Sequence, residues 1–283
     1  MIGQFDHTHF NMASSVRRTL LGCLCCAAMF SLAAIPNSTQ AEDGQSSKVK
    51  TVASTSRHPL APALRVAERS LKAAKETEAF SGIFSKRENV NGVLTEKTHM
   101  QIKWRSTPFS VYMKFVEPHA GREVIYVDGK NEGNLLIHET GVKSLVGTLS
   151  FKPNSPRVMA EGRYPITEIG LVKLAEAVIA QWQTETKYGE IDVKYYKNAK
   201  LNGKPCRVIQ TSHPRPRKQF KFQMTRLYID AETSLPLRVE QYGFPTTAGG
   251  KSVLMEEYEY SQLDTKADLN DIDFDTRNPN YGY

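Results

Sequence analysis

The fold of this chain is decided by the stretch Phe80-Ser81-Gly82-Ile83-Phe84-Ser85-Lys86-Arg87-Glu88, the turn Asn91-Gly92 and the return Val93–Arg105. In the first run the phenylalanines and the serines occupy alternating positions, which is the period of a strand with one face toward a core. An Asn-Gly pair between two such runs favours a tight hairpin turn. The stretch therefore predicts two antiparallel strands that are neighbours in one sheet.

The same strand pattern continues toward the end of the chain. Short loops between consecutive strands, including a second Asn-Gly turn at Asn202-Gly203, favour an antiparallel meander. Besides the two strands above, we expect strands at residues 109–115, 122–128, 134–139, 190–201, 205–212, 219–230, 235–244 and 253–261.

Two further segments have the three- and four-residue spacing of apolar side chains that is typical of an amphipathic helix. The first stripe is Leu60, Leu64, Ala67, Leu71 and Ala74, and the second is Leu171, Leu174, Ala175, Val178 and Trp182. Thr167 is the expected N-cap of the second helix. A sheet of about ten strands curls, and two helices cover only one of its faces. We therefore expect an α+β fold, in which a curved antiparallel sheet forms a half-open barrel with two long helices over its concave face.

The first 41 residues predict a signal peptide. Arg17 and Arg18 precede a run of 16 residues without a charge, Leu20–Ile35, and small residues lead to a cleavage site after Ala41. The run is shorter than the roughly 20 residues that span a bilayer, so an uncleaved anchor is an alternative interpretation. Leu20-Leu21-Gly22-Cys23 also resembles a lipoprotein box, and the arginine pair resembles a twin-arginine signal. We expect an exported protein of the periplasm or cell envelope.

Behind the signal peptide, residues 42–59 are rich in Ser, Thr and Lys and predict a flexible tether. Residues 60–283 then predict a single domain. Three of the four cysteines precede Ala41, so only Cys206 remains in this domain. This excludes a disulfide-stapled scaffold and a zinc site with two or more thiolates.

Catalytic motifs are missing from the sequence, which has no nucleophile elbow, no zinc-protease helix, no phosphate loop and no dinucleotide fingerprint. We therefore predict no catalytic residue, no metal site and no cofactor. A net charge of +7 is too small to indicate nucleic-acid binding. The basic stretch Pro214–Lys218 is either a charged hairpin tip or a site of attraction to an anionic membrane surface. Glu256, Glu257 and Glu259 are either a carboxylate pair for acid–base chemistry or the solvated edge of a strand.

Bulky apolar side chains are frequent on alternating strand positions. There are more of them than two helices are expected to cover. Where they stay uncovered they would line an apolar cavity suited to an acyl chain, and otherwise they pack as a core. The candidate cavity residues are Phe80, Phe84, Phe109, Val111, Met113, Phe115, Phe220, Phe222 and Met224.

Three segments resemble the superfamily of periplasmic lipoprotein carriers and receptors of the LolA/LolB type, with the related RseB. They are Gln101–Arg105 followed by Phe109, Tyr126-Val127-Asp128-Gly129-Lys130, and Leu227–Arg238 with its "DxxTxLP" hairpin. The resemblance implies an incomplete barrel around an apolar cavity and a role in handling lipid or lipoprotein acyl chains. It also implies that Arg105 latches the helical lid, although the proline that directly follows this arginine in the carriers is here Pro108.

A closer resemblance is to the domain-of-unknown-function 1571 (DUF1571) family. It rests on Phe80–Glu88, on Pro108-Phe109-Ser110-Val111-Tyr112-Met113 and on Gly121-Arg122-Glu123-Val124-Ile125-Tyr126-Val127. This family name implies no activity.

Three functions remain open. The first is a non-catalytic, monomeric binding protein, a carrier, receptor or sensor, for lipid or lipoprotein acyl chains. The second is an envelope hydrolase that uses Tyr112, Glu117, Arg122 and Glu123, which could equally be a structural salt-bridge set. The third is a structural module that binds a partner through the same sheet, and one fold hosts many functions.

Overall fold

The computed structural model describes residues 58–247 and 249–283. The predicted signal peptide and residues 42–57 of the predicted tether lie outside this part of the chain. The helices and strands follow one another as α1 (Leu60–Lys75), β1 (Ala79–Val90), β2 (Val93–Leu94), β3 (Thr98–Arg105), β4 (Ser110–Glu117), β5 (Glu123–Val127), β6 (Leu135–His138), β7 (Leu149–Phe151), α2 (Pro156–Met159), α3 (Leu171–Glu185), β8 (Asp192–Leu201), β9 (Lys204–Ser212), β10 (Met224–Asp230), β11 (Pro236–Gly243) and β12 (Val253–Asp264). Short 3-10 turns include η3 (Gly141–Val146), η4 (Ile166–Glu168) and η5 (Asp271–Phe274).

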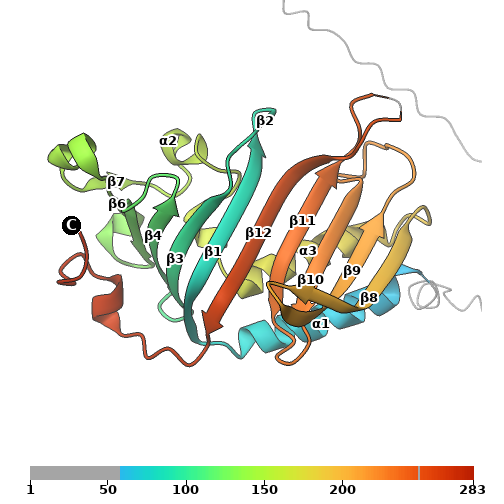
Figure 1. Ribbon diagram of the computed structural model, residues 1–283, viewed down its shortest axis with the longest axis horizontal. Coiled ribbons are helices and arrows are strands. Elements are labelled where there is room, and N and C mark those ends of the chain that lie inside the picture. The colour runs from blue at the N-terminus through green and yellow to red at the C-terminus, as the bar shows by residue number, and fades with distance from the viewer. Residues whose placement is uncertain (1–57, 248) are drawn as a thin grey trace, which may run out of the picture. The chain divides into compact units, whose positions relative to one another are not determined.

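The strands of the described residues form one antiparallel sheet of 12 strands that does not close (Figure 1). Its order is β7-β6-β5-β4-β3-β1-β12-β11-β10-β9-β8, with β2 paired to β1. Two meanders, β1 to β7 and β8 to β12, are therefore joined along the β1–β12 pair. The predicted curved, open, antiparallel sheet is confirmed, with two strands more than expected.

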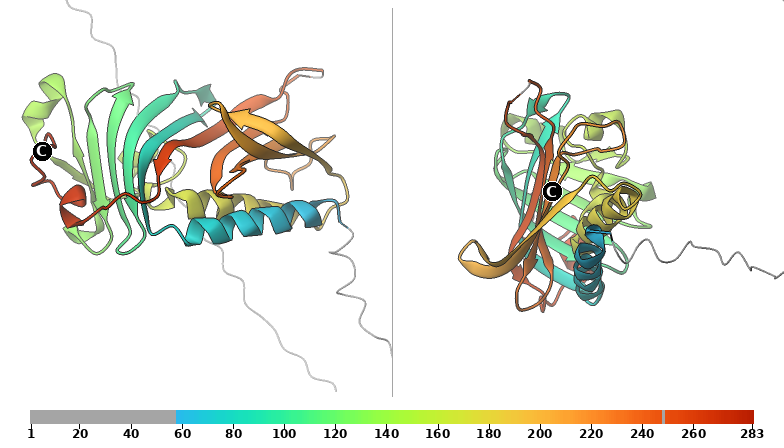
Figure 2. Two further views of the ribbon diagram at one scale, coloured as in Figure 1. Left: turned by 60° about the horizontal axis from the view of Figure 1, so that its bottom comes forward. Right: turned by 90° about the vertical axis from the view of Figure 1, so that its right-hand side faces the viewer.

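The helices α1 and α3 lie side by side on the concave face of the sheet (Figure 2). Their apolar stripes pack over β9, β10 and β11, where Trp182 and Leu64 meet Ile209 and Leu227 in one buried cluster. The two predicted helices are confirmed. Because both lie over this half of the sheet, the half formed by β1 and β3 to β7 needs another cover.

That cover is the roof segment, residues 156–170, together with the first turns of α3. Ile166 is buried against the strands, and Ile169 and Val158 pack beside it. The indole nitrogen of Trp104 on β3 donates a hydrogen bond to the carbonyl of Ile169 at 3.2 Å. The roof segment is thereby tied to the aromatic core of the sheet.

The N-cap prediction for α3 is wrong. Thr167 lies in η4, and the helix begins after Gly170, whose φ is 130°. A Cβ at position 170 would lie 2.8 Å from Trp104 Nε1. The backbone N–H of Gly170 also donates to the buried hydroxyl of Tyr260 at 2.8 Å. Only glycine combines this backbone conformation with so close an approach.

Two strand predictions also need correction. The strand expected at 219–230 begins only at Met224, because residues 213–223 form a loop after β9. Glu256, Glu257 and Glu259 are not at a solvated edge, since β12 is a central strand and all three are buried. Local alternation cannot reveal strand order, and here the last strand of the chain pairs with the first.

The C-terminal end of α3 is anchored by a buried histidine. His213 Nε2 lies 3.3 Å from a carboxylate oxygen of Glu185, and its Nδ1 lies 2.9 Å from the carbonyl of Glu190. Burial acts to lower the pKa of His213, but the contact with the Glu185 carboxylate and the hydrogen bond to the Glu190 carbonyl outweigh it and raise this pKa above its usual value. The protonated histidine therefore stabilises the fold.

The stability of the protein should follow this titration. Because the folded pKa is raised, the stabilisation is complete below the unfolded value of about 6.5 and is lost as pH rises through the folded pKa. Urea unfolding at a series of pH values through this titration should show that the difference in the free energy of unfolding between the wild type and His213→Gln shrinks as pH rises. A constant difference would contradict a charged His213–Glu185 pair.

Candidate functional site: a cavity beneath the roof segment

A cavity of about 690 Å³ lies between the concave face and the roof segment. Its floor comes mainly from the half of the sheet that α1 and α3 leave free, β12 and β11 add residues such as Tyr258 and Val239, and α3 contributes its first turns. The apolar lining is Phe84, Met100, Met113, Phe115, Val124, Leu135, Ile137, Leu149, Phe151, Val158, Ile166, Ile169, Leu174, Ala177, Val178 and Val239. This volume is within the range of about 300–1,000 Å³ that is usual for small-molecule sites.

One end of the cavity is polar. Glu88 on β1 and Glu256 on β12 face each other across the strand pair and are 2% and 4% exposed. Arg163 of the roof segment donates from Nε to Glu256 at 2.6 Å, and Lys86 donates to Glu88 at 2.8 Å. Burial raises the pKa of Glu256, which the charges of Arg163 and Lys221 partly offset.

A second ion pair holds the roof segment nearby. Arg122 contacts Glu139 at 2.7 Å and Glu161 of the roof segment at 2.9 Å, with its guanidinium over the ring of Phe115. The buried carboxylates Glu88 and Glu256 and the buried Arg122 are thus already paired within the protein. The ion pairs fix the roof segment to the sheet.

The nine apolar candidates from the sequence fall into three groups. Those that line the cavity are Phe84, Met113 and Phe115. Those that pack in the aromatic core beside it are Phe80, Phe109 and Val111. Those that lie elsewhere are Phe220, Phe222 and Met224.

The last group was expected in the cavity because the sequence pattern predicted a strand from residue 219, whereas residues 219–223 lie in a loop. Phe220 lies in the loop and stacks on the ring of His213 at 3.6 Å between centroids. Phe222 is buried in the same loop beneath the ammonium of Lys221. Met224 does start a strand, but its parity matches Arg226 and Tyr228, which lie on the convex face. None of these three lines the cavity.

The four polar candidates do not form one cluster. Tyr112 donates to Glu123 at 3.1 Å on the convex face, and burial together with Glu123 raises the pKa of Tyr112. Arg122 lines the cavity on the other face, and Glu117 lies 3.8 Å from His99 in an exposed position. The sheet therefore separates the residues of the predicted hydrolase site.

Arg105 lies at the end of β3 and contacts the C-terminal segment, residues 265–283. Its guanidinium pairs with Asp271 at 2.9 Å and lies over the ring of Phe274. The same segment stacks Tyr281 on Tyr112 at 4.0 Å between centroids. In this structure Arg105 thus holds the C-terminal segment, and not α1 or α3, against the sheet.

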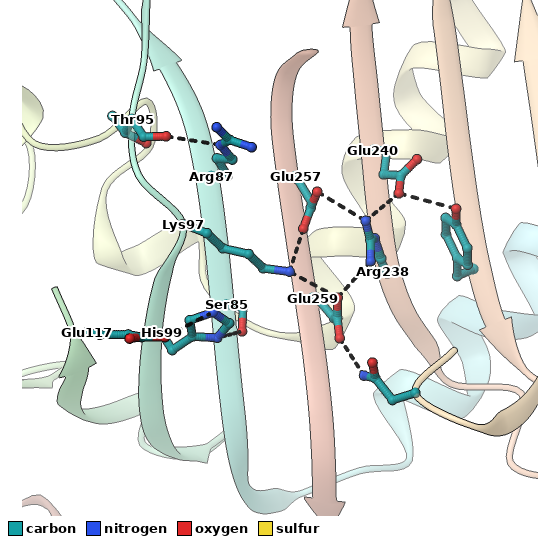
Figure 3. A network of polar contacts seen from close by, with 12 residues as sticks. Ser85, Arg87, Thr95, Lys97, His99, Glu117, Arg238, Glu240, Glu257 and Glu259 are labelled. Atoms are coloured by element: carbon teal, nitrogen blue, oxygen red, sulfur yellow. Dashed lines mark hydrogen bonds and ion pairs between the residues drawn. The ribbon is translucent and has the colours of Figure 1, made fainter. Parts of the chain in front are cut away.

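The convex face carries a polar network across β1, β3, β12 and β11 (Figure 3). Arg238 contacts three buried carboxylates, those of Glu240 at 2.5 Å, Glu257 at 3.1 Å and Glu259 at 2.9 Å. Lys97 pairs with Glu257 at 2.8 Å. These carboxylates are balanced by cations and hold four strands together where no helix covers them.

At the edge of this network Ser85 contacts Nδ1 of His99 at 2.7 Å, and Glu117 lies on the far side of the ring (Figure 3). The three side chains resemble a Ser-His-acid relay. However, Ser85 is only 3% exposed in the middle of β1, so a substrate carbonyl cannot reach its hydroxyl. The arrangement is structural.

Within the described residues, no group of three or more His, Cys, Asp or Glu side chains could hold a metal ion. In the same part of the chain, no helix has the length and apolarity needed to cross a membrane. Cys206 is a free, buried cysteine on β9.

Sequence reasoning missed most of the cavity lining. Met100 has the same strand parity as its paired residue Phe84, so this part of the floor could have been found from alternation. The roof segment could not, because its residues follow no helix or strand period.

Comparisons with known proteins define the family. The chain belongs to the family described as "Protein of unknown function (DUF1571)", whose model matches residues 77–283. No curated protein sequence matches this chain.

Several solved structures are similar. MucB is 16% identical with a TM-score of 0.43 over 76% of this chain, and the match spans only 62% of MucB. The Mycobacterium tuberculosis lipoprotein LppX is 12% identical, with a TM-score of 0.41 over 74% of this chain and 99% of LppX. The LolA superfamily protein NE2245 from Nitrosomonas europaea is 10% identical, with a TM-score of 0.31 over 75% of this chain and 96% of that protein.

Proposed function

We propose that this protein is an exported, non-catalytic and monomeric binding protein that encloses an acyl chain of a lipid or lipoprotein. The observation that carries the proposal is the cavity of about 690 Å³ between the sheet and the roof segment, with its largely apolar lining. Export rests on the sequence pattern of the first 41 residues.

The energetics favour an apolar ligand. The buried charged groups of the lining are engaged in ion pairs, so they gain little from a new partner. Burying a methylene group is worth about 0.8 kcal/mol, and an acyl chain offers many of them. Apolar contact alone can therefore supply the affinity.

Native mass spectrometry of the full chain, expressed with export, tests this proposal. We expect a monomer that starts after Ala41 and carries lipid, and that takes up a fluorescent fatty acid. The double variant Met113→Trp/Leu174→Trp places indole rings in the cavity from floor and roof, and it should lose at least about 90% of the uptake, since an occupied pocket leaves no room.

A matched control is Val93→Trp, which adds the same ring to an exposed position on β2 outside the cavity lining. It should bind like the wild type. The proposal is overturned if the wild type carries no lipid and takes up no fatty acid, or if the double variant still binds while its melting temperature is unchanged.

A further inference from the structure

The most exposed apolar residues of the described chain are concentrated in one turn. In η3, between β6 and β7, Val142 is 84% exposed, Leu145 is 86% exposed and Val146 is 70% exposed. No residue of η3 is buried, so these side chains support no core. Exposed apolar residues gathered on one element mark an interaction site.

The turn lies at the cavity. Lys143, in the middle of η3, is part of the cavity lining, and so are Leu149 and Phe151 of the strand that follows it. The strand that follows η3 therefore carries apolar side chains into the space beneath the roof segment.

The charge around this surface is positive. Lys143 and Arg157 of α2 both line the cavity and are exposed. Among the described residues, neither makes an ion pair or a side-chain hydrogen bond. The nearby acidic side chains Glu139 and Glu161 are taken by Arg122. Two free cations beside an apolar tip complement a surface that is anionic outside and apolar inside.

We propose that η3 docks on an anionic lipid bilayer, with Val142, Leu145 and Val146 entering the interface while Lys143 and Arg157 contact the headgroups. Apolar side chains flanked by basic ones bind membrane surfaces in this way. The inference deepens the proposed function, because docking would bring the cavity to the source or the destination of its acyl chain.

This site differs from the one that the sequence suggested. In the basic stretch Pro214–Lys218, Arg217 is engaged in an ion pair with Glu190. No residue of that stretch lines the cavity.

Vesicle flotation tests the docking surface, with vesicles of phosphatidylcholine mixed with phosphatidylglycerol and with pure phosphatidylcholine. The wild type should float with the mixed vesicles. The triple variant Val142→Ser/Leu145→Ser/Val146→Ser should lower the partition coefficient at least about tenfold, because three apolar side chains no longer enter the interface. The charge variant Lys143→Glu/Arg157→Glu should abolish the preference for mixed over pure vesicles.

The matched control is Tyr195→Ser/Tyr196→Ser, which removes two exposed aromatic residues from β8 at the opposite edge of the sheet. It should float like the wild type. Docking is overturned if the wild type does not float, or if the triple variant floats equally well. Met113→Trp/Leu174→Trp should still float, so a failure of acyl binding is seen separately from a failure of docking.

Discussion

Replacing Arg238 by methionine should lower the free energy of unfolding by about 3–5 kcal/mol, among the largest losses expected for a single side chain outside the core. The guanidinium is the shared partner of Glu240, Glu257 and Glu259, all at least 92% buried on the convex face. Without it, only Lys97 and Arg226 remain to balance three neighbouring carboxylates. Methionine keeps much of the volume of the arginine side chain, so the loss of stability reports the removal of its charge.

Urea unfolding at neutral pH checks this expectation. In Arg238→Met/Glu257→Gln the deficit should be smaller than the sum of the two single effects, because the partners share one network.

Arg87→Met is the matched control for this experiment. Arg87 lies on the same face and donates one hydrogen bond to the carbonyl of Thr95 (Figure 3). Its loss should cost only about 0.5–1.5 kcal/mol. Equal losses for Arg87→Met and Arg238→Met would show that the network does not hold the strands together.

The same network shows why the strands could be predicted from the sequence, whereas the burial of their polar side chains could not. The alternation around Phe84 and the Asn-Gly turns are local signals, and both were sufficient for the correct strands. The burial of Glu257 depends on β12 lying between β1 and β11, which is a pairing of segments more than 150 residues apart. A run of glutamates looks solvated until its neighbours across the sheet are known.

The residues of the candidate site were likewise only partly predictable from the sequence. On β4, alternation puts Met113 and Phe115 on one face, and the cavity lining includes both residues. The polar candidates failed because adjacent residues of a strand point to opposite faces, so Arg122 and Glu123 cannot act together. The roof segment follows no period, and its position depends on Glu161 and Arg163 finding partners on the sheet.

Replacing Trp182 by alanine should be the other large loss, about 3–5 kcal/mol in the free energy of unfolding. Trp182 is fully buried in the cluster that joins α3 to β9, β10 and β11. Its indole N–H donates to the hydroxyl of Thr211 at 3.2 Å, and that hydroxyl would lose its partner. The alanine would leave a cavity that the rigid sheet cannot fill.

This substitution should also weaken acyl binding, since Leu174 and Val178 on the same helix line the cavity. Trp182→Phe keeps most of the ring and loses the hydrogen bond, so it should cost about 1–2 kcal/mol and largely preserve fatty-acid uptake. Tyr195→Ala, on an aromatic residue that is 44% exposed, should change stability by less than about 0.5 kcal/mol. Urea unfolding and the fluorescent uptake assay measure both effects on the same samples. If Trp182→Ala loses stability but binds fatty acid normally, then α3 anchors the sheet without forming the wall of the ligand site.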